Sequence, residues 1–216
     1  MVLPLPVGPV TKTIPCGEVI ALRSFFKSLS SKPKSLKALS PASLFKIRIT
    51  IRSLFFVGKI EKVVTLKKEN INHALESIIN YLKKRNSSLI KFKFKPLKSP
   101  AYCLINKTLF DWVIENLVKN SIDSMKGEGI IEFSILKSAS EIKILIKDNG
   151  EGINKEIQNK IFNSGYSTKI KGWGLGLSLA KRIITQNHNG DIYVKKSEVN
   201  LGTEIIISLA EFKDKI

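Results

Sequence analysis

The residues best suited to chemistry in this chain share one side of a predicted helix. At about 100° per residue, five polar side chains fall within roughly 140° of arc; they are Glu115, Asn116, Lys119, Asn120 and Asp123. Asparagine lowers helix propensity, so two of them one turn apart indicate a compensating role. Amide carbonyls beside carboxylates suit a hard cation such as Mg²⁺. The alternative is an exposed helix face that happens to be rich in asparagine.

A second candidate is the turn Asp148-Asn149-Gly150-Glu151-Gly152, which directly follows a predicted strand. Its two glycines permit a tight turn and let the backbone approach a flat ligand closely. A carboxylate at the end of a strand can accept a hydrogen bond from an exocyclic amine, such as the one on adenine. The alternative is a plain Asp-Asn-Gly turn, which is common in proteins.

A third candidate is the glycine-rich stretch Gly172–Leu177, which comes just before a predicted helix. Glycines at a helix start expose backbone N–H groups, and the helix dipole adds positive potential there. This pattern indicates an anion site, for which a triphosphate is the obvious anion. No strand directly precedes the stretch, and no Gly-Lys-Ser/Thr follows its second glycine, so it fits neither a dinucleotide fingerprint nor a P-loop.

Two weaker signals complete the set. Ile161–Lys169 is rich in small, polar and glycine residues, as expected of a mobile lid. Lys169 could reach phosphate oxygens as a point charge, although a solvated loop lysine explains it equally well. Gly202-Thr203 opens the last predicted strand, where the Thr203 hydroxyl could bind a base or a water; threonine is also simply a good strand residue.

The elements that must position these residues alternate from residue 59 onward. Apolar spacing and capping residues predict helices over residues 70–84, 106–125, 154–162 and 175–187. Alternating apolar residues predict strands over residues 62–66, 89–94, 102–104, 130–136, 141–147, 191–196 and 203–209. This order predicts an α/β (α+β) two-layer sandwich, with a mixed, mostly antiparallel sheet, about three substantial helices on one face and a flexible lid.

The first 58 residues differ from the rest. They hold nine of the 36 basic residues but one of the 18 acidic ones, with prolines and serines throughout. We expect residues 1–58 to be a basic, poorly ordered N-terminal extension of a folded domain at residues 59–216. The alternative is a basic arm that docks on a partner or on anionic lipid.

Composition narrows the function classes. The net charge of +18 favours polyanions, but no aromatic stacking platform or helix-turn-helix pattern indicates specific nucleic-acid binding. The sequence has no run of 18 apolar residues, so no transmembrane segment is predicted. Its first ten residues do not make a convincing signal peptide. Cys16 and Cys103 make neither a disulfide framework nor a zinc site. We therefore expect a cytoplasmic protein.

Taken in order, these five signals resemble the ATP-binding catalytic domain of sensor histidine kinases. That domain belongs to the ATPase superfamily shared with gyrase, the ninety-kilodalton heat-shock chaperone and mismatch-repair proteins. The resemblance covers roughly residues 60–210, and the stretches 172–181 and 188–192 resemble the kinase branch in particular. It implies ATP and Mg²⁺ as cofactors, and phosphoryl transfer by positioning and charge neutralisation.

The resemblance implies roles for the helix face. Asn120 would coordinate the Mg²⁺ that bridges the phosphates, and Asn116 would also face the nucleotide. Glu115 would orient or activate the attacking group, and Lys119 would contact phosphate. Asp123 would be a further nucleotide-binding residue on this helix face.

The resemblance implies further contacts to the base and the phosphates. Asp148 would bind the adenine amino group, and Thr203 would support it through water. The other implied nucleotide contacts lie in the turn, the ATP lid and the glycine-rich stretch: Gly150, Gly152, Ile153, Phe162, Thr168, Lys169, Gly172, Gly174, Leu175, Gly176 and Leu177.

The phosphoacceptor histidine is not in its usual place. Residues 1–58 hold no histidine, His73 lies on the first helix of the resembling region, and His188 matches an ordinary histidine near the domain's end. We therefore expect a protein-histidine kinase domain that is truncated or acts in trans. Its partners would be a phosphoacceptor-histidine protein or domain and, downstream, a response regulator, with a homo-oligomer left open. The alternatives are a non-catalytic ATP-binding regulator that docks a partner, and an ATPase or serine kinase of the wider superfamily.

Overall fold

The structure is a computed structural model, and it describes residues 64–167 and 174–213. The predicted extension and its boundary with the folded domain lie outside these residues and stay predictions. Within the same two ranges, no helix has the length and apolar character that crossing a membrane requires.

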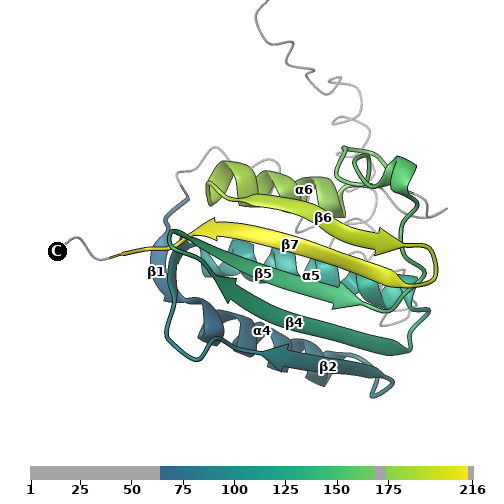
Figure 1. The fold of residues 1–216 in the computed structure, drawn as a ribbon, viewed down its shortest axis with the longest axis horizontal. Helices are drawn as coiled ribbons and strands as arrows, with labels where there is room; N and C mark the ends of the chain where they lie inside the picture. Colours follow the sequence, from purple (N-terminus) through teal and green to yellow (C-terminus); the bar gives the residue numbers. More distant parts are fainter. Residues whose placement is uncertain (1–63, 168–173, 214–216) are drawn as a thin grey trace, which may run out of the picture. The chain divides into compact units, whose positions relative to one another are not determined.

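A five-stranded sheet forms one layer of the fold (Figure 1). Its strands run in the order β2 (Ile90–Lys95), β4 (Gly129–Lys137), β5 (Glu141–Asp148), β7 (Gly202–Ala210) and β6 (Asp191–Glu198). β2 pairs with β4 in parallel, and the other three pairings are antiparallel. The predicted mixed, mostly antiparallel sheet is confirmed.

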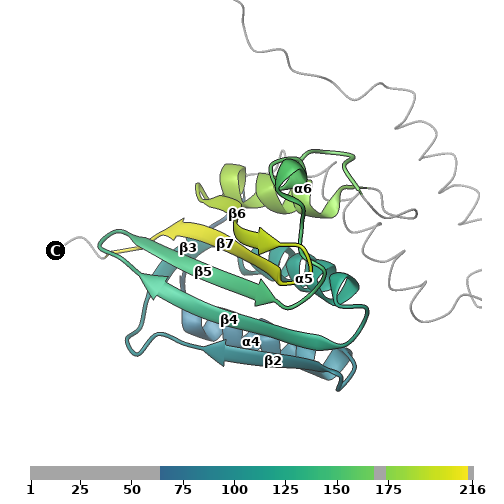
Figure 2. The ribbon, with the colours of Figure 1, turned by 45° about the vertical axis from the view of Figure 1, so that its right-hand side comes forward.

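The second layer consists of helices on one face of this sheet. Among the described residues the α-helices are α4 (Ile71–Arg85), α5 (Lys107–Ser124) and α6 (Gly176–Arg182). Figure 2 shows α4 behind the β2 end of the sheet and α6 at the β6 end, with α5 between them. This confirms the two-layer sandwich, and it makes α5 the helix that crosses behind the middle of the sheet.

The core lies between α5 and the central strands. Fully buried Phe110, Ile114 and Leu117 of α5 face inward, as do Phe133 of β4 and Ile144 of β5. Burial of apolar surface of this kind is the main stabilising contribution to a domain. The polar residues that flank this apolar stripe on α5 are thereby held at fixed positions relative to the ends of the strands.

The first strand is displaced from its predicted position. Residues 64–66 are not in a strand; β1 is Lys67–Asn70, and it pairs antiparallel with β3 (Tyr102–Ile105) in a separate two-stranded sheet. Residues 62 and 63 of the predicted strand lie outside the described residues, and the pairing with β3 sets where β1 begins and ends. Asn70 then caps α4 as predicted, because its side chain accepts the N–H groups of Asn72 and His73.

Two predicted helices are shorter than expected. Residues 154–162 form only a 3₁₀ turn at Lys155–Ile157 followed by further turns, in which Lys160 N–H donates to the Ile157 carbonyl at 2.8 Å. The side-chain amide of Gln158 donates to the carbonyls of Ile153 and Ser197, which ties this segment to β6. The helix predicted over 175–187 is α6 followed by a π-helical turn at Ile183–Asn187.

Among the strands of residues 64–167 and 174–213, β2 is an outer one, and its side chains alternate as predicted. Ile90 is buried and Phe92 and Phe94 are half-buried, whereas the lysines between them are exposed. The phenylalanine at position 92 stacks on Phe133 of β4, with ring centroids 6.5 Å apart.

Candidate functional site

Asp148, the last residue of β5, is the centre of the candidate site. Its side chain is buried, with 6% of its surface exposed. Oδ1 accepts the backbone N–H groups of Gly150 at 3.0 Å and Thr203 at 3.2 Å, and Oδ2 accepts the hydroxyl of Ser121 at 2.8 Å. One carboxylate therefore joins β5, the turn after it, β7 and α5, which brings three of the sequence signals together.

Ser121 is a site residue that the sequence analysis missed. It lies on α5 directly after Asn120 and is 7% exposed. At helical spacing it falls beside Leu117 and Met125, so it interrupts an apolar stripe. A buried hydroxyl needs a hydrogen-bond partner, and this polar residue on an apolar face was the signal that could have identified it.

The turn after Asp148 packs against the end of α5. A Cβ atom on Gly150 would lie 2.2 Å from Ser124 Oγ, so only glycine permits this approach. The N–H of Glu151 donates to the Ser124 carbonyl at 3.1 Å, and Asn149 Oδ1 accepts the N–H of Ile130 at 2.8 Å. The Asp-Asn-Gly sequence is therefore fixed to two neighbouring elements and is more than a plain surface turn.

The Gly202-Thr203 pair closes the other side of Asp148. Gly202 has φ +91°, and a Cβ there would lie 2.0 Å from the Asp148 carbonyl oxygen. The Thr203 hydroxyl lies 2.8 Å from Ser197 Oγ, which also accepts the N–H of Ile153 at 2.8 Å. It is thus the Thr203 backbone that reaches Asp148, while its hydroxyl links the strand to the segment that follows the turn.

A second group of predicted residues meets where α5 passes α6. The Asn116 amide donates to the Trp112 carbonyl at 2.8 Å, and only 8% of the residue is exposed. A Cβ on Gly176 would lie 3.1 Å from Asn116 Oδ1, so the start of α6 is in close contact with this asparagine. The asparagine-bearing helix and the glycine-rich stretch are therefore neighbours.

The described part of the predicted lid is joined to the glycine-rich stretch. The N–H of Gly165 donates to the Gly174 carbonyl at 3.1 Å. Gly174 has φ +63°, and a Cβ there would lie 2.6 Å from the N atom of Tyr166. Phe162 is buried, with Lys181 Nζ 5.5 Å from its ring centroid. Thr168, Lys169 and Gly172 lie outside the described residues.

The remaining predicted residues are less buried than Asp148 and Asn116. Glu115, Lys119 and Asn120 are half-buried and Asp123 is exposed. Four further residues of the turn and of the glycine-rich stretch are half-buried: Gly152, Ile153, Leu175 and Leu177. Within the described part of the chain, no group of three or more His, Cys, Asp or Glu side chains is placed to hold a metal ion by itself.

His188 has a structural position. It is 5% exposed, and its Nε2 accepts the backbone N–H of Asn106 at 3.1 Å. Nδ1 lies 3.0 Å from the Ile183 carbonyl and must be the protonated nitrogen, because Nε2 accepts. Burial lowers the pKa of His188, so the neutral ring is favoured. Both ring nitrogens are engaged in holding the end of the π-helical turn against the start of α5.

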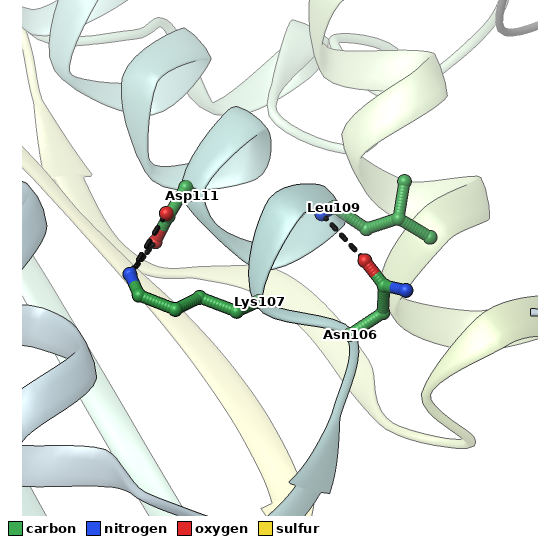
Figure 3. Close-up of polar contacts among 4 residues, drawn as sticks. All are labelled: Asn106, Lys107, Leu109 and Asp111. Carbon is green, nitrogen blue, oxygen red and sulfur yellow. Dashed lines mark hydrogen bonds and ion pairs between the residues drawn. The ribbon is translucent and has the colours of Figure 1, made fainter. Parts of the chain in front are cut away.

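Asn106, which donates its N–H to His188, also fixes the start of α5 (Figure 3). Asn106 Oδ1 accepts the N–H of Leu109 at 3.1 Å and so caps the helix, as predicted. One turn into the helix, Lys107 Nζ lies 2.8 Å from Asp111 Oδ2. The pKa of Asp111 is raised, because partial burial of its carboxyl outweighs the opposing effect of Lys107. The asparagine cap and the ion pair together define where this helix begins.

An open groove of about 470 Å³ does not include Asp148 among its lining residues. It is lined by the segment after the turn and by β6: Ile153, Asn154, Lys155, Gln158, Lys195, Lys196, Ser197, Glu198 and Val199. Of the predicted site residues it contains Ile153 alone, so we do not assign it to the candidate site.

Comparison with known proteins agrees with this arrangement. Residues 106–212 match the family model described as histidine kinase-, DNA gyrase B- and HSP90-like ATPase. Sporulation kinase C of Bacillus subtilis (strain 168) is 31% identical over 161 residues, which are 73% of this chain and 37% of that protein. Sporulation kinase D of the same organism is 40% identical over 97 residues, 45% of this chain and 19% of that protein. The chain thus spans well under half the length of these relatives.

Solved structures share the fold. The catalytic domain of histidine kinase ThkA superposes with a TM-score of 0.61 at 24% identity, covering 68% of this chain and 95% of that one. ThkA in complex with the response regulator protein TrrA gives a TM-score of 0.66 at 19% identity, covering 90% of this chain and 57% of that one. Residues 106–212 therefore match the histidine kinase-, DNA gyrase B- and HSP90-like ATPase family, and the chain shares the fold of the catalytic domain of a histidine kinase.

Proposed function

We propose that this chain binds Mg-ATP and transfers the γ-phosphoryl group to a histidine held in another domain or in a separate protein. The observation that carries the proposal is the Asp148 carboxylate, which is buried and held by donors from α5, β7 and the intervening turn. A carboxylate accepts about four hydrogen bonds, so three donors leave one lone pair for a ligand. The exocyclic amine of adenine fits that acceptor.

The phosphate end of the nucleotide is assigned to the other group of residues. Asn116 and Gly176 lie in contact, so a chain of phosphates that leaves the base along α5 would pass between this helix and the start of α6. Gly174, Leu175 and Leu177 belong to the same stretch. We assign Lys119 to phosphate contact and Glu115 to orienting the attacking group, because both lie half-buried on the side of α5 that also carries Asn120.

Mg²⁺ is proposed at Asn120. This ion is usually held by one or two protein groups together with substrate phosphates, so one amide oxygen from the protein is a sufficient start. When bound, the ion neutralises charge on the phosphates. Asn120 directly precedes Ser121 on α5, and the hydroxyl of Ser121 donates to Asp148, which supports a proposal that puts both ends of the nucleotide along this helix.

The partners follow from the proposed reaction. The phosphoryl acceptor is proposed to be a histidine on another domain or protein; His188 is unsuited to the role, because both of its ring nitrogens are engaged. ThkA forms a complex with its response regulator, and we propose a response regulator as the downstream partner here as well. The assignments of Thr168 and Lys169 to the lid, and of Gly172 to phosphate contact, remain part of the proposal.

The experiment is phosphoryl transfer from γ-labelled ATP with MgCl₂. The full chain is incubated alone and with the phosphoacceptor-histidine domain of a relative such as sporulation kinase C. Label on the acceptor that is lost in acid and kept in alkali identifies phosphohistidine and supports the proposal. A variant of that domain without its histidine is the matched control.

Three other outcomes would overturn the proposal. Acid-stable label would identify a serine kinase, and release of phosphate without labelled protein would identify an ATPase. Binding of ATP with neither transfer nor hydrolysis would identify a nucleotide-sensing regulator. Each of these outcomes leaves the nucleotide site in place and changes the reaction.

A further inference from the structure

We propose that one edge of the domain, formed by α4, β2 and the turn that joins them, is a docking surface for an anionic lipid bilayer. Figures 1 and 2 show β2 as the lowest strand of the sheet, with α4 behind it. We call residues 81–98 of this region the α4–β2 edge. None of the predicted nucleotide contacts lies in these residues, so the inference does not depend on the proposed function.

The charge of the α4–β2 edge has one sign. Residues 83–98 hold seven basic side chains and no acidic one. Lys93 pairs with Glu132 at 3.0 Å. The other lysines are exposed, and none of them forms an ion pair with a residue of the described chain: Lys83, Lys84, Lys91, Lys95 and Lys98.

Lysines on other elements differ, because many of them pair with a carboxylate. These pairs involve Lys107, Lys126, Lys137, Lys143, Lys195 and Lys196. The lack of acidic partners is therefore a property of the α4–β2 edge and not of a lysine-rich composition in general. Exposed charges of one sign repel one another, so a polyanion that neutralises them is favoured here.

Hydrogen bonds hold these lysines along one edge. The Asn72 side chain of α4 makes two hydrogen bonds of 3.0 Å with the backbone of Leu97, which fixes the segment after β2 beside the start of the helix. The Asn86 side chain donates to the Leu82 carbonyl at 2.7 Å and so fixes the turn from α4 into β2. Because β2 has six residues, the lysines along it extend over about 20 Å.

Two apolar side chains project from the same edge. Leu89 is 55% exposed and Tyr81 is 43% exposed. The N–H of Leu89 donates to Ser87 Oγ at 3.2 Å, and its carbonyl accepts the N–H of Gly129 at 3.2 Å. The guanidinium of Arg85 lies 5.2 Å from the centroid of the Tyr81 ring. Leu89 is therefore held in solvent between the lysines of α4 and those of β2.

An anionic bilayer fits this combination. Clusters of basic residues bind anionic headgroups, tyrosine favours the membrane interface, and a leucine among them can enter the apolar layer. Nucleic acid would bind the same charges, and its bases would also stack on exposed aromatic rings. The phenylalanines of β2 are half-buried instead, and Phe92 stacks on Phe133. The exposed leucine and the half-buried rings therefore favour lipid over nucleic acid.

The test reads the reactivity of individual lysines, because residues 1–58 are basic as well. The full chain is acetylated alone and with vesicles of equal parts phosphatidylcholine and phosphatidylglycerol, and mass spectrometry gives the rate at each lysine. We expect Lys84 and Lys91 to react several-fold more slowly on these vesicles, and at an unchanged rate with phosphatidylcholine alone. Lys155 and Lys160 are the internal control, since they are exposed on the segment tied to β6, at the opposite end of the strand order.

Variants test the same surface by its affinity. Each basic residue near an anionic bilayer strengthens binding about fivefold, so Lys84→Gln with Lys91→Gln should weaken partition onto these vesicles about 30-fold. Lys155→Gln with Lys160→Gln is the matched control, because it removes the same charge and should change partition much less. Leu89→Gln should weaken partition about fivefold, since about half of this side chain is exposed.

Three results would overturn the proposal. Unchanged rates at Lys84 and Lys91 on anionic vesicles, with slower reaction confined to residues 1–58, would refute the docking surface. Equal losses in the two double variants would show a response to net charge alone. Protection of the edge lysines by an oligonucleotide and not by anionic vesicles would identify nucleic acid as the partner. The acetylation experiment uses the wild-type chain, so it decides the matter even if a variant unfolds.

Discussion

Replacing Asp148 by asparagine tests the site at its centre. The amide has nearly the shape of the carboxylate, and its oxygen can still accept the N–H groups of Gly150 and Thr203. The nitrogen then takes the place of Oδ2, so an acceptor becomes a donor. The hydroxyl of Ser121 must turn around, and the amine of a bound adenine meets a donor instead of a lone pair.

The size of the effect follows from the bonds that change. A hydrogen bond to a charged group contributes about 1.5–3 kcal/mol, and the amine–carboxylate bond would be lost. This corresponds to an increase in Kd for MgATP of about tenfold to 150-fold. Because the two backbone contacts survive, the free energy of unfolding should change much less than the free energy of binding.

Titration calorimetry with MgATP, together with thermal unfolding of the same samples, gives both numbers. The control is Glu141→Gln, which makes the same chemical change at the first residue of β5, where the carboxylate contacts Ser208. Glu141→Gln should bind MgATP like the wild-type protein. A Kd for Asp148→Asn within twofold of the wild-type value would refute the assignment of Asp148 to the base.

Four shorter predictions concern other parts of the domain. Asn120→Ala should weaken MgATP at least tenfold, which calorimetry measures directly, and this loss should disappear in the absence of Mg²⁺. Gly176→Ala would place a Cβ 3.1 Å from Asn116 Oδ1, so MgATP affinity should fall with little change in melting temperature. Burial lowers the pKa of His188, so as pH falls the unfolded chain binds a proton at this residue before the folded protein does. The free energy of unfolding in urea should therefore decrease below about pH 6.5, and this decrease should be smaller in His188→Gln. Burial raises the pKa of Cys103 to about 12, so iodoacetamide at pH 8 should modify its peptide in urea and not in the native protein, as read by mass spectrometry.

The sequence predicted the long elements well, because their signals are local. The helices expected at 70–84 and 106–125 are Ile71–Arg85 and Lys107–Ser124, each with the expected asparagine cap. Their apolar spacing extends over several turns, and a capping side chain needs only its next few residues. The predictions of the short elements were wrong because contacts between distant residues define them. β1 is defined by its pairing with β3, and residues 154–162 are defined by contacts with β6.

For the candidate site, the sequence predicted which residues lie near one another but not the hydrogen bonds between them. Residue types and order identified Asp148, the glycines and Thr203 as a set. The contact between Asp148 and Ser121 joins residues 27 positions apart, so no local pattern could supply it. Likewise, the contact between Asn116 and Gly176 depends on how α5 and α6 pack. The order of residues along the chain thus indicated which of them come together, and tertiary packing determines the hydrogen bonds between them.

The outer position of β2 bears on how copies of this domain meet. An outer strand presents unpaired backbone groups that can extend a sheet into a neighbouring molecule. Lys91, Lys93 and Lys95 are exposed along this strand, and Lys93 pairs with Glu132 of β4 at 3.0 Å, so two such edges brought together would align two rows of net positive charge. Repulsion of this kind disfavours edge-to-edge aggregation at low ionic strength, and any self-association should use another surface.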